Sequence, residues 1–231
     1  MKSLSKMYDY EKLVTNSPLD KLLGGGIEKR SITQIYGPPG SGKTNISLIL
    51  AVNVAKSGKK VVYIDSEGGL SINRIKQLSG SDFEEVAKNI LVLEPHSFHE
   101  QYENLKLVDS MISSKSKDVD LVILDSAVAL YRVEDDRNKS NLLGQQMSLL
   151  SSISRLYDVA VIVTNQIYSS FDENSDEIKP IGGTILQYWS KTILELSRDV
   201  ETGDRIALLK RHKFLVEGLA IHFKITDNGI E

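Results

Sequence analysis

The residues best suited to chemistry form one run, Gly-Pro-Pro-Gly-Ser-Gly-Lys-Thr, at residues 37–44. The run fits G-x-x-x-x-G-K-[ST] at every fixed position, which is the pattern of a phosphate-binding loop. Glycines let backbone N–H groups turn towards an anion, Lys43 can reach the β and γ phosphates of a nucleotide, and Thr44 can offer a hydroxyl to Mg²⁺. ATP and Mg²⁺ are therefore the expected cofactors. The expected nucleotide contacts are Gly37, Pro38, Pro39, Gly40, Ser41, Gly42, Lys43 and Thr44.

The segments on either side of this run agree with that interpretation. Residues 31–36 form a β-rich run, and residues 45–56 carry apolar residues at helical spacing. The alternative, an ordinary glycine-rich turn before a helix, is disfavoured because a strand and a helix flank the full pattern. The sequence therefore predicts a strand, a phosphate-binding loop and a helix in that order.

Three further polar side chains, Glu67, Asp125 and Gln166, follow short apolar runs that are typical of buried parallel strands. In open α/β sheets ligands bind outside the carboxyl ends of the strands, so these side chains are expected beside the phosphate-binding loop. Glu67 is then placed to activate water, Asp125 to help hold the metal, and Gln166 to sense the γ phosphate or position water. Each has a structural alternative, since the acids could cap helices and the amide could satisfy backbone groups. The apolar runs cover residues 60–65, 120–125 and 159–164.

The rest of the chain continues this alternation, which predicts an α/β fold with a mostly parallel central sheet flanked by helices. The last third differs, because short β runs follow one another with turns rather than helices between them. These runs predict antiparallel C-terminal strands that extend one edge of the sheet. We expect a single domain over residues 1–231, with 1–15 as a lead-in. Expected helices cover 71–78, 83–88, 98–113 and 142–157, and further expected strands cover 90–93, 192–197, 205–209 and 219–225.

Composition restricts the classes of function. The 231 residues are 41% hydrophobic and 26% charged, and no apolar run approaches the length of a membrane span. The absence of cysteine excludes disulfides, thiol catalysis and cysteine-based metal sites. A formal net charge of −3 and a pI near 5.9 argue against a constitutively basic nucleic-acid binder, although they allow a local basic patch. We therefore expect a soluble, cytoplasmic protein without membrane contact, and any affinity for DNA should be local and salt-sensitive.

Taken together, these motifs make the chain resemble the RecA superfamily, and within it the archaeal RadA and RadB recombinases, most closely the RadB group of recombinase paralogues. The resemblance covers nearly all of residues 16–231 and implies a RecA-like P-loop ATPase core. The order and spacing of the matching pieces leave little room for chance agreement. These pieces lie at residues 22–28, 37–44, 63–68, 124–126, 129–132, 164–166, 182–184 and 223–230.

Roles for the polar residues follow from the resemblance. It implies a catalytic group of Lys43, Glu67 and Gln166, in which Glu67 is the general base for water and Gln166 senses the γ phosphate. It also implies that Thr44 binds magnesium and that Asp125 lies in the metal's outer shell. The enzymatic activity implied is weak ATP hydrolysis at most.

Three cations are implied as further nucleotide contacts. Arg74 is expected against the adenine. Arg211, His212 and Lys213 look like the Lys-His-Arg cluster of RadB proteins with its two cations exchanged. Arg211 and Lys213 are therefore expected to bind phosphate, either within the chain or on a neighbour. The alternative for this cluster is a solvated turn.

The resemblance also implies two DNA-binding loops, near residues 131–141 and 167–183. The first contains a polar segment, 132–139, that balances three cations against three acids, and the second opposes four acids to one lysine. Neither offers the cation surplus that drives phosphate binding, so DNA affinity should be modest. The implied DNA contacts are Arg132, Arg137, Lys139, Gly182 and Gly183, with Tyr131, Tyr168 or Phe171 placed to stack on bases. The acids are Glu134, Asp135, Asp136, Asp172, Glu173, Asp176 and Glu177, and the single lysine is Lys179.

The expected function is that of an ATP-binding, DNA-binding recombinase paralogue in DNA repair and homologous recombination. It should assist the main recombinase without strand exchange of its own, and bind single-stranded or branched DNA. Expected partners are the main recombinase or a junction-processing nuclease, and self-association is left open.

Two departures from the family and two alternative functions bear on this expectation. The helix-hairpin-helix domain and the Phe-x-x-Ala motif of a full RadA are missing from the sequence, which argues against filaments. A KaiC-like signalling ATPase and a nucleotide-gated protein adaptor are the alternatives. The motifs at 65–68 and 182–184 favour the recombinase branch over the KaiC-like one.

Overall fold

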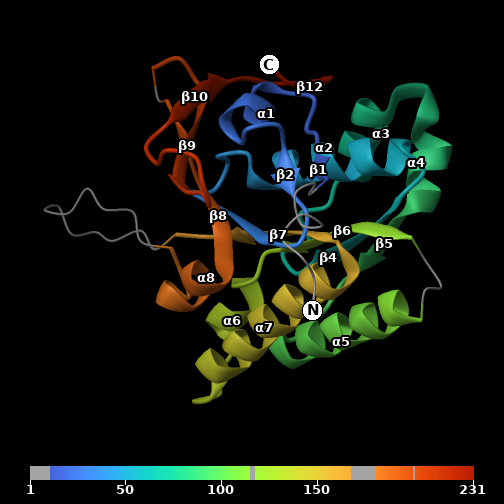
Figure 1. Ribbon diagram of the computed structural model, residues 1–231, viewed down its shortest axis with the longest axis vertical. Helices are drawn as coiled ribbons and strands as arrows, with labels where there is room; N and C mark the ends of the chain where they lie inside the picture. Colours follow the sequence, from blue (N-terminus) through green and yellow to red (C-terminus); the bar gives the residue numbers. More distant parts are fainter. Residues whose placement is uncertain (1–10, 115–117, 168–179, 200) are drawn as a thin grey trace, which may run out of the picture.

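The computed structural model describes residues 11–114, 118–167, 180–199 and 201–231, and it shows a central sheet with helices on both faces (Figure 1). Within these residues the sheet has eight strands in the order β10-β9-β8-β3-β7-β6-β4-β5. The strands are β3 (Ile32–Tyr36), β4 (Lys60–Asp65), β5 (Ile90–Leu93), β6 (Val119–Asp125), β7 (Ala160–Asn165), β8 (Ser190–Arg198), β9 (Arg205–Arg211) and β10 (Ala220–Phe223).

Strand direction confirms the expected α/β class. The strands from β8 through β3, β7, β6 and β4 to β5 are all parallel, whereas β9 and β10 are antiparallel to their neighbours. The last third therefore does extend one edge of the sheet. Its first strand, β8, nevertheless runs parallel to β3. The chain reaches β8 through α8 (Gly183–Trp189), which returns it to the side of the sheet where the parallel strands begin.

The C-terminal prediction of one strand over 219–225 is wrong in its bounds. The sheet strand β10 ends at Phe223, and Ile225 begins a separate hairpin of β11 (Ile225–Thr226) and β12 (Gly229–Ile230). Backbone hydrogen bonds between Lys224 and Glu231 continue this hairpin, so the chain leaves the sheet at that point. A second small hairpin near the N-terminus pairs β1 (Lys12–Leu13) with β2 (Ile27–Glu28).

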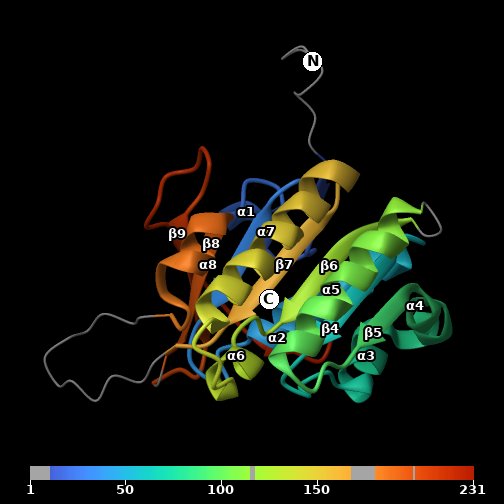
Figure 2. The same cartoon turned by 90° about the horizontal axis from the view of Figure 1, so that it is seen from below.

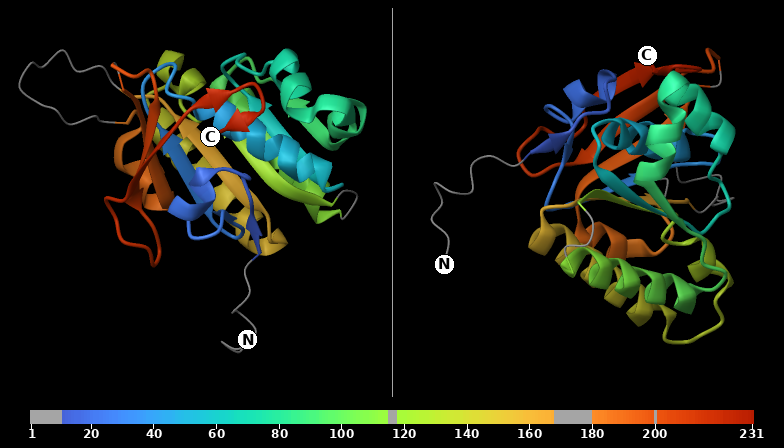
Figure 3. Two further views of the ribbon diagram at one scale, coloured as in Figure 1. Left: turned by 90° about the horizontal axis from the view of Figure 1, so that it is seen from above. Right: turned by 90° about the vertical axis from the view of Figure 1, so that its right-hand side faces the viewer.

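Helices cover both faces of the sheet. In Figure 1, α2, α3 and α4 lie above the sheet and α5, α7 and α8 lie below it, and the right-hand view of Figure 3 shows the sheet between the two layers. Figure 2 shows α5 and α7 side by side across the lower face. The helices other than α8 are α1 (Pro18–Leu22), α2 (Lys43–Lys56), α3 (Ile72–Ser79), α4 (Phe83–Asn89), α5 (Phe98–Ser113), α6 (Ala129–Val133) and α7 (Lys139–Tyr157), with a 3-10 turn, η2, at Gly80–Asp82.

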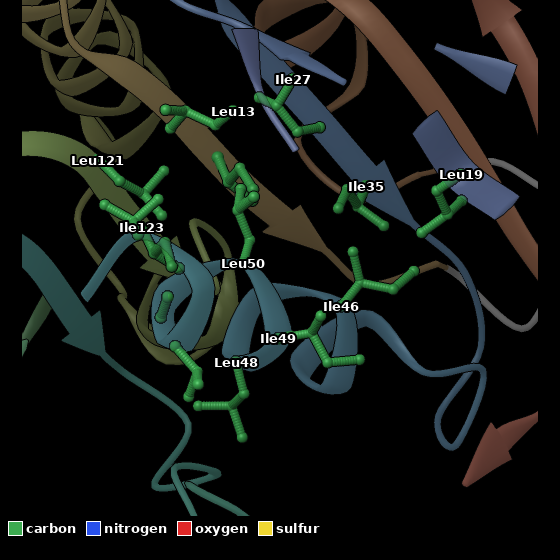
Figure 4. Close-up of a cluster of buried hydrophobic side chains, with 14 of the residues drawn as sticks. Leu13, Leu19, Ile27, Ile35, Ile46, Leu48, Ile49, Leu50, Leu121 and Ile123 are labelled. Carbon is green, nitrogen blue, oxygen red and sulfur yellow. The ribbon is translucent and has the colours of Figure 1, made fainter. Parts of the chain in front are cut away.

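Two hydrophobic cores follow from the two-residue period of the central strands. In β6, Leu121 and Ile123 join the core beneath α2, while Val122 and Leu124 join the core against α5 and α7. Figure 4 shows the first core, where Leu50 of α2 lies among side chains of the sheet. Because both faces are buried, the strands are continuous apolar runs, which is why the sequence predicted parallel strands.

The segment expected as the first DNA-binding loop is partly helical. Residues 129–133 form α6, and α7 begins at Lys139, three residues earlier than predicted. Tyr131 explains the order of α6, because its ring packs edge-on against Phe98 of α5 with centroids 5.6 Å apart. Among the helices of the described residues, none has the length and apolar character that crossing a bilayer requires.

Candidate nucleotide-binding site

The phosphate-binding loop connects β3 to α2, and close contacts require its glycines. A Cβ added at Gly37 would lie 2.2 Å from the carbonyl oxygen of Leu196 in β8. Gly42 is the N-cap of α2 with a φ of 107°, where an added Cβ would lie 2.9 Å from Ile225. A side chain at either position would therefore displace the loop from β8 or from the C-terminal hairpin.

Lys43 points back into the curve of this loop. Its Nζ donates hydrogen bonds to the carbonyl oxygens of Gly37 and Pro38, at 2.8 and 3.0 Å. Burial lowers the pKa of Lys43, and the charges of Glu67 and Asp125 oppose that shift. The ammonium group of Lys43 is thus enclosed by the loop, and its contact with phosphate stays a prediction.

Asp125 lies at the carboxyl end of β6 within a set of hydroxyl groups. Tyr63 donates to its Oδ2 at 2.6 Å, and Thr164 of β7 donates to its Oδ1. Burial raises the pKa of Asp125, while hydrogen bonds from Thr164, Tyr63 and Thr44 lower it. Thr44 and Asp125 therefore lie within hydrogen-bond reach of each other, and their roles at a metal ion stay predictions. The peptide bond that follows Asp125 is cis.

Glu67 owes its position to Asp65, which the sequence analysis did not assign to the site. The carboxylate of Asp65 accepts hydrogen bonds from the backbone N–H groups of Glu67, Gly69 and Leu70, at 3.3, 3.1 and 2.9 Å. These bonds close a tight turn directly after β4. An aspartate that ends a strand before a glycine pair was the available signal for this turn.

Three side chains form a hydrogen-bonded chain at the rim of the site. Gln166 Nε2 donates to Glu67 Oε1 at 2.8 Å, and Arg132 Nη1 donates to Gln166 Oε1 at 2.6 Å. Gln166 follows β7 and Arg132 lies in α6, so the chain joins three segments that are distant in sequence. The structure thus brings Glu67 and Gln166 together as expected. Arg132, which was expected to contact DNA, instead forms a hydrogen bond with Gln166.

A cavity of about 380 Å³ lies beside the loop, and it is lined by Lys43, Thr44, Glu67 and Gln166 together with Arg205. Arg205 was missed, because only the pairing of β8 with β9 brings the start of β9 to the loop. Its Nη1 donates to the carbonyl oxygen of Gly203 at 2.7 Å, and its buried Nε has no hydrogen-bond partner among the described residues. Arg205 is therefore a further cation facing this cavity.

Arg74 joins the start of α2 to the C-terminal hairpin. Its guanidinium donates to Asn45 Oδ1 at 2.9 Å and to the carbonyl oxygens of Thr226 and Asp227, at 2.7 and 3.1 Å. Burial lowers the pKa of Arg74, and the charge of Asp227 opposes that shift. Arg74 is not one of the residues that line the 380 Å³ cavity. Its contact with an adenine ring stays a prediction.

Arg211 and Lys213 lie away from the loop. Arg211 Nη1 donates to the carbonyl oxygen of Gln187 in α8 at 2.6 Å, and Lys213 Nζ forms an ion pair with Glu28 at 2.7 Å. Gln187 precedes β8 and Glu28 precedes β3, so both cations lie towards the amino ends of strands whose carboxyl ends carry the loop. They are therefore not positioned to touch a nucleotide in the same chain.

The remaining residues expected at DNA are spread over two segments. Lys139 donates to the carbonyl oxygen of Glu134 at 2.6 Å and lies over the ring of Tyr131, while the side chain of Arg137 is exposed. Gly182 is the N-cap of α8 with a φ of 80°, and Gly183 opens that helix. The expectations that fall outside the described residues concern Tyr168, Phe171, Asp172, Glu173, Asp176, Glu177 and Lys179.

The mostly parallel sheet with helices on both faces defines a RecA-like α/β fold, and comparisons with known proteins agree. The Rad51 family model matches residues 11–231. The chain is 60% identical to the DNA repair and recombination protein RadB of Methanobrevibacter smithii and 51% identical to that of Methanosphaera stadtmanae, over 100% of each chain. A crystal structure of the RadB recombinase superposes with a TM-score of 0.79 at 37% identity, covering 94% of this chain and 98% of that one. The chain belongs to the Rad51 family, as a RadB-like recombinase paralogue.

Proposed function

We propose that the protein is an ATP-binding, weakly hydrolysing and DNA-binding recombinase paralogue that assists the main recombinase in DNA repair and homologous recombination. The observation that carries the proposal is the gathering of Lys43, Thr44, Glu67 and Gln166 around one cavity. Lys43 and Thr44 begin α2 directly after the loop that follows β3, Glu67 follows β4 and Gln166 follows β7, so three parallel strands contribute from their carboxyl ends. That rim is where an open α/β sheet binds its ligand.

The residues present fit a nucleotide with its metal. Within the part of the chain that the structure describes, Ser41 Oγ is buried without a hydrogen-bond partner. The first N–H groups of α2 have no carbonyl acceptor within the helix, so both kinds of group can bind phosphate oxygens. Thr44 and Asp125 supply the hard oxygen atoms that Mg²⁺ prefers. In the described residues no three His, Asp or Glu side chains group as a metal cage. Mg²⁺ would therefore depend on Thr44, Asp125 and the phosphates, and it would supply positive charge at the β and γ phosphates.

Weak hydrolysis is the expected chemistry of this arrangement. Lys43 would exchange the carbonyl oxygens of Gly37 and Pro38 for phosphate oxygens, which are charged and therefore stronger acceptors. Glu67 would accept a proton from the attacking water as general base. One oxygen of Glu67 already accepts a hydrogen bond from Gln166. Water must therefore be activated by the other oxygen of Glu67, or Gln166 must first move away. Either requirement is consistent with slow turnover.

The proposal of DNA binding is supported by membership of the Rad51 family and by three cationic side chains. Arg132 lies on α6, Arg137 lies between α6 and α7, and Lys139 is the first residue of α7. Few phosphate contacts support modest affinity, with single-stranded or branched DNA as ligands and the main recombinase or a junction-processing nuclease as partners. The Rad51 family match favours this function over a KaiC-like signalling ATPase. A nucleotide-gated adaptor stays as the alternative if DNA does not bind.

Arg211 and Lys213 are proposed to serve a neighbouring molecule. Their location towards the amino ends of β3 and β8 removes them from the nucleotide of their own chain. On a second copy they could reach a phosphate if the protein self-associates.

Titration with single-stranded, duplex and branched DNA, with and without ATP, tests the proposed function. Binding of at least one DNA that changes with ATP is expected. A protein that binds ATP but none of the three DNAs would contradict the recombinase function and leave the adaptor. Lys43→Ala serves as the matched control, because any ATP dependence must disappear in it.

A further inference from the structure

The hydrogen bond between Arg132 and Gln166 bears on how the site distinguishes ATP from ADP. Arg132 was expected to bind DNA phosphate, yet its guanidinium donates to Gln166 Oε1 at 2.6 Å. A guanidinium carries only donors, so the oxygen of the Gln166 amide must face α6. The NH₂ group of Gln166 then faces the other way, where it donates to Glu67 at 2.8 Å.

We infer that Arg132 is a positioning residue of the nucleotide site: it fixes the amide of Gln166 so that the NH₂ donor faces the cavity. The inference rests on the proposed nucleotide function. Without Arg132, the Gln166 amide could turn over and present its oxygen to the cavity. Such an oxygen would repel a γ phosphate, since both groups are acceptors.

The supports of α6 show why Arg132 can hold this geometry. The neighbouring Tyr131 packs edge-on against Phe98 of α5, and Lys139 lies over the same ring at 5.1 Å from its centroid. Lys139 also donates to the carbonyl oxygen of Glu134, which directly follows α6. Figure 2 shows α6 beside α7 at one end of that helix. The backbone carrying Arg132 is therefore fixed from both of its sides.

The same contact has a consequence for DNA. A phosphate oxygen is charged and is a stronger acceptor for a guanidinium than the neutral amide of Gln166. Arg132 uses the group that it would need for DNA while it holds Gln166. Arg137 is the matched comparison, because it is an exposed cation of the same segment whose side chain has no hydrogen bond or ion pair in the described part of the chain.

The test compares affinities for ATPγS and ADP, measured by calorimetry without DNA, in wild type, Arg132→Ala, Arg137→Ala and Gln166→Ala. ATPγS carries a γ phosphate and ADP does not, so the ratio of their dissociation constants reports on the sensor. We expect Arg132→Ala to lower the preference for ATPγS about fivefold, Arg137→Ala to leave it unchanged, and Arg132→Lys to restore part of it. In a Gln166→Ala background, Arg132→Ala should cause no further change.

Three results would overturn the inference: equal preferences in Arg132→Ala and Arg137→Ala, effects of Arg132→Ala and Gln166→Ala that multiply, or a wild type with no preference. Thermal unfolding is used to check that each variant is folded. Because Arg132 is exposed, its loss should leave the midpoint of unfolding unchanged.

Lys43→Ala separates a failure of the role inferred for Arg132 from a failure of the nucleotide site itself. If Lys43→Ala keeps its affinity for both nucleotides, the nucleotide site is wrong; if it loses affinity while Arg132→Ala matches Arg137→Ala, only the role of Arg132 is wrong.

Discussion

Tyr63 donates a 2.6 Å hydrogen bond to Asp125 from the adjacent strand, and both side chains are buried. The bond joins β4 to β6 at the rim where the nucleotide is proposed to bind. It partly offsets the cost of an ionised carboxylate that is 2% exposed. A buried carboxylate whose pKa is raised by burial is characteristic of functional sites.

Asp125→Asn is expected to stabilise the nucleotide-free protein by about 1 kcal/mol at pH 7 and to abolish the Mg²⁺ dependence of ATP binding. Burial raises the pKa of Asp125 in the folded protein. Ionised Asp125 therefore lowers the free energy of unfolding at pH values above its pKa in the folded protein. This destabilisation disappears as pH falls below the pKa of aspartate in the unfolded chain, about 4. The gain from Asn should shrink as pH is lowered towards 4. Urea unfolding across pH measures it; a gain that grows on acidification would contradict the burial argument.

Glu67→Gln should keep ATP affinity within about twofold and reduce hydrolysis about 100-fold, or to background, because an amide cannot accept the proton of water. Single-turnover hydrolysis and calorimetry separate the two effects. Glu84→Gln, at an exposed acid of α4, is the matched control. Turnover at the wild-type rate in Glu67→Gln would show that another group is the base.

Arg205→Gln should weaken ATP binding about fivefold, because it removes a cation that lines the cavity and leaves the fold of β9 intact. ADP binding should fall less if Arg205 faces the γ phosphate. Lys210→Gln is the control on the same strand, since Lys210 pairs with Glu195 at 3.3 Å. Equal ATP affinity in both variants would remove Arg205 from the site.

His212 should make stability depend on pH. Its Nδ1 accepts hydrogen bonds from the backbone N–H groups of Phe214 and Leu215, and burial lowers its pKa. The unfolded chain therefore binds a proton at His212 more readily than the folded protein does. The contribution of neutral His212 to the free energy of unfolding is complete above the pKa of histidine in the unfolded chain, about 6.5, and is lost as pH falls below it. Thermal unfolding at pH 7.5 and 5.5 should show a larger loss in wild type than in His212→Gln. An equal loss in both would assign the pH dependence to other groups.

The sequence predicted the parts of the site that local pattern determines. Lys43 and Thr44 lie in a motif of fixed spacing, and Glu67, Asp125 and Gln166 follow buried strands, so one topological rule placed them on the same rim. The helix over 98–113 was predicted with its observed bounds from its amphipathic pattern, and in the structure Ser97 caps its start.

What the sequence could not predict depends on contacts between distant segments. Arg205 reaches the cavity through the register of β8 with β9, and Arg132 reaches Gln166 because Tyr131 orders α6 on α5. Neither relationship leaves a periodic signal in the chain. The break between β10 and β11 was missed for the same reason, since the pairing partner of Ile225 is Ile230 and not β9.

Calorimetric titration of wild type and Lys43→Ala with Mg²⁺ and ATP tests the central claim most directly. Lys43 Nζ is enclosed by the loop and faces the proposed β and γ phosphates, so its removal deletes the main charge-assisted contact. We predict saturable ATP binding by wild type, and binding by Lys43→Ala that is lost or at least about 100-fold weaker. ATP affinity that is unchanged in Lys43→Ala would contradict the assignment of this loop as the nucleotide site.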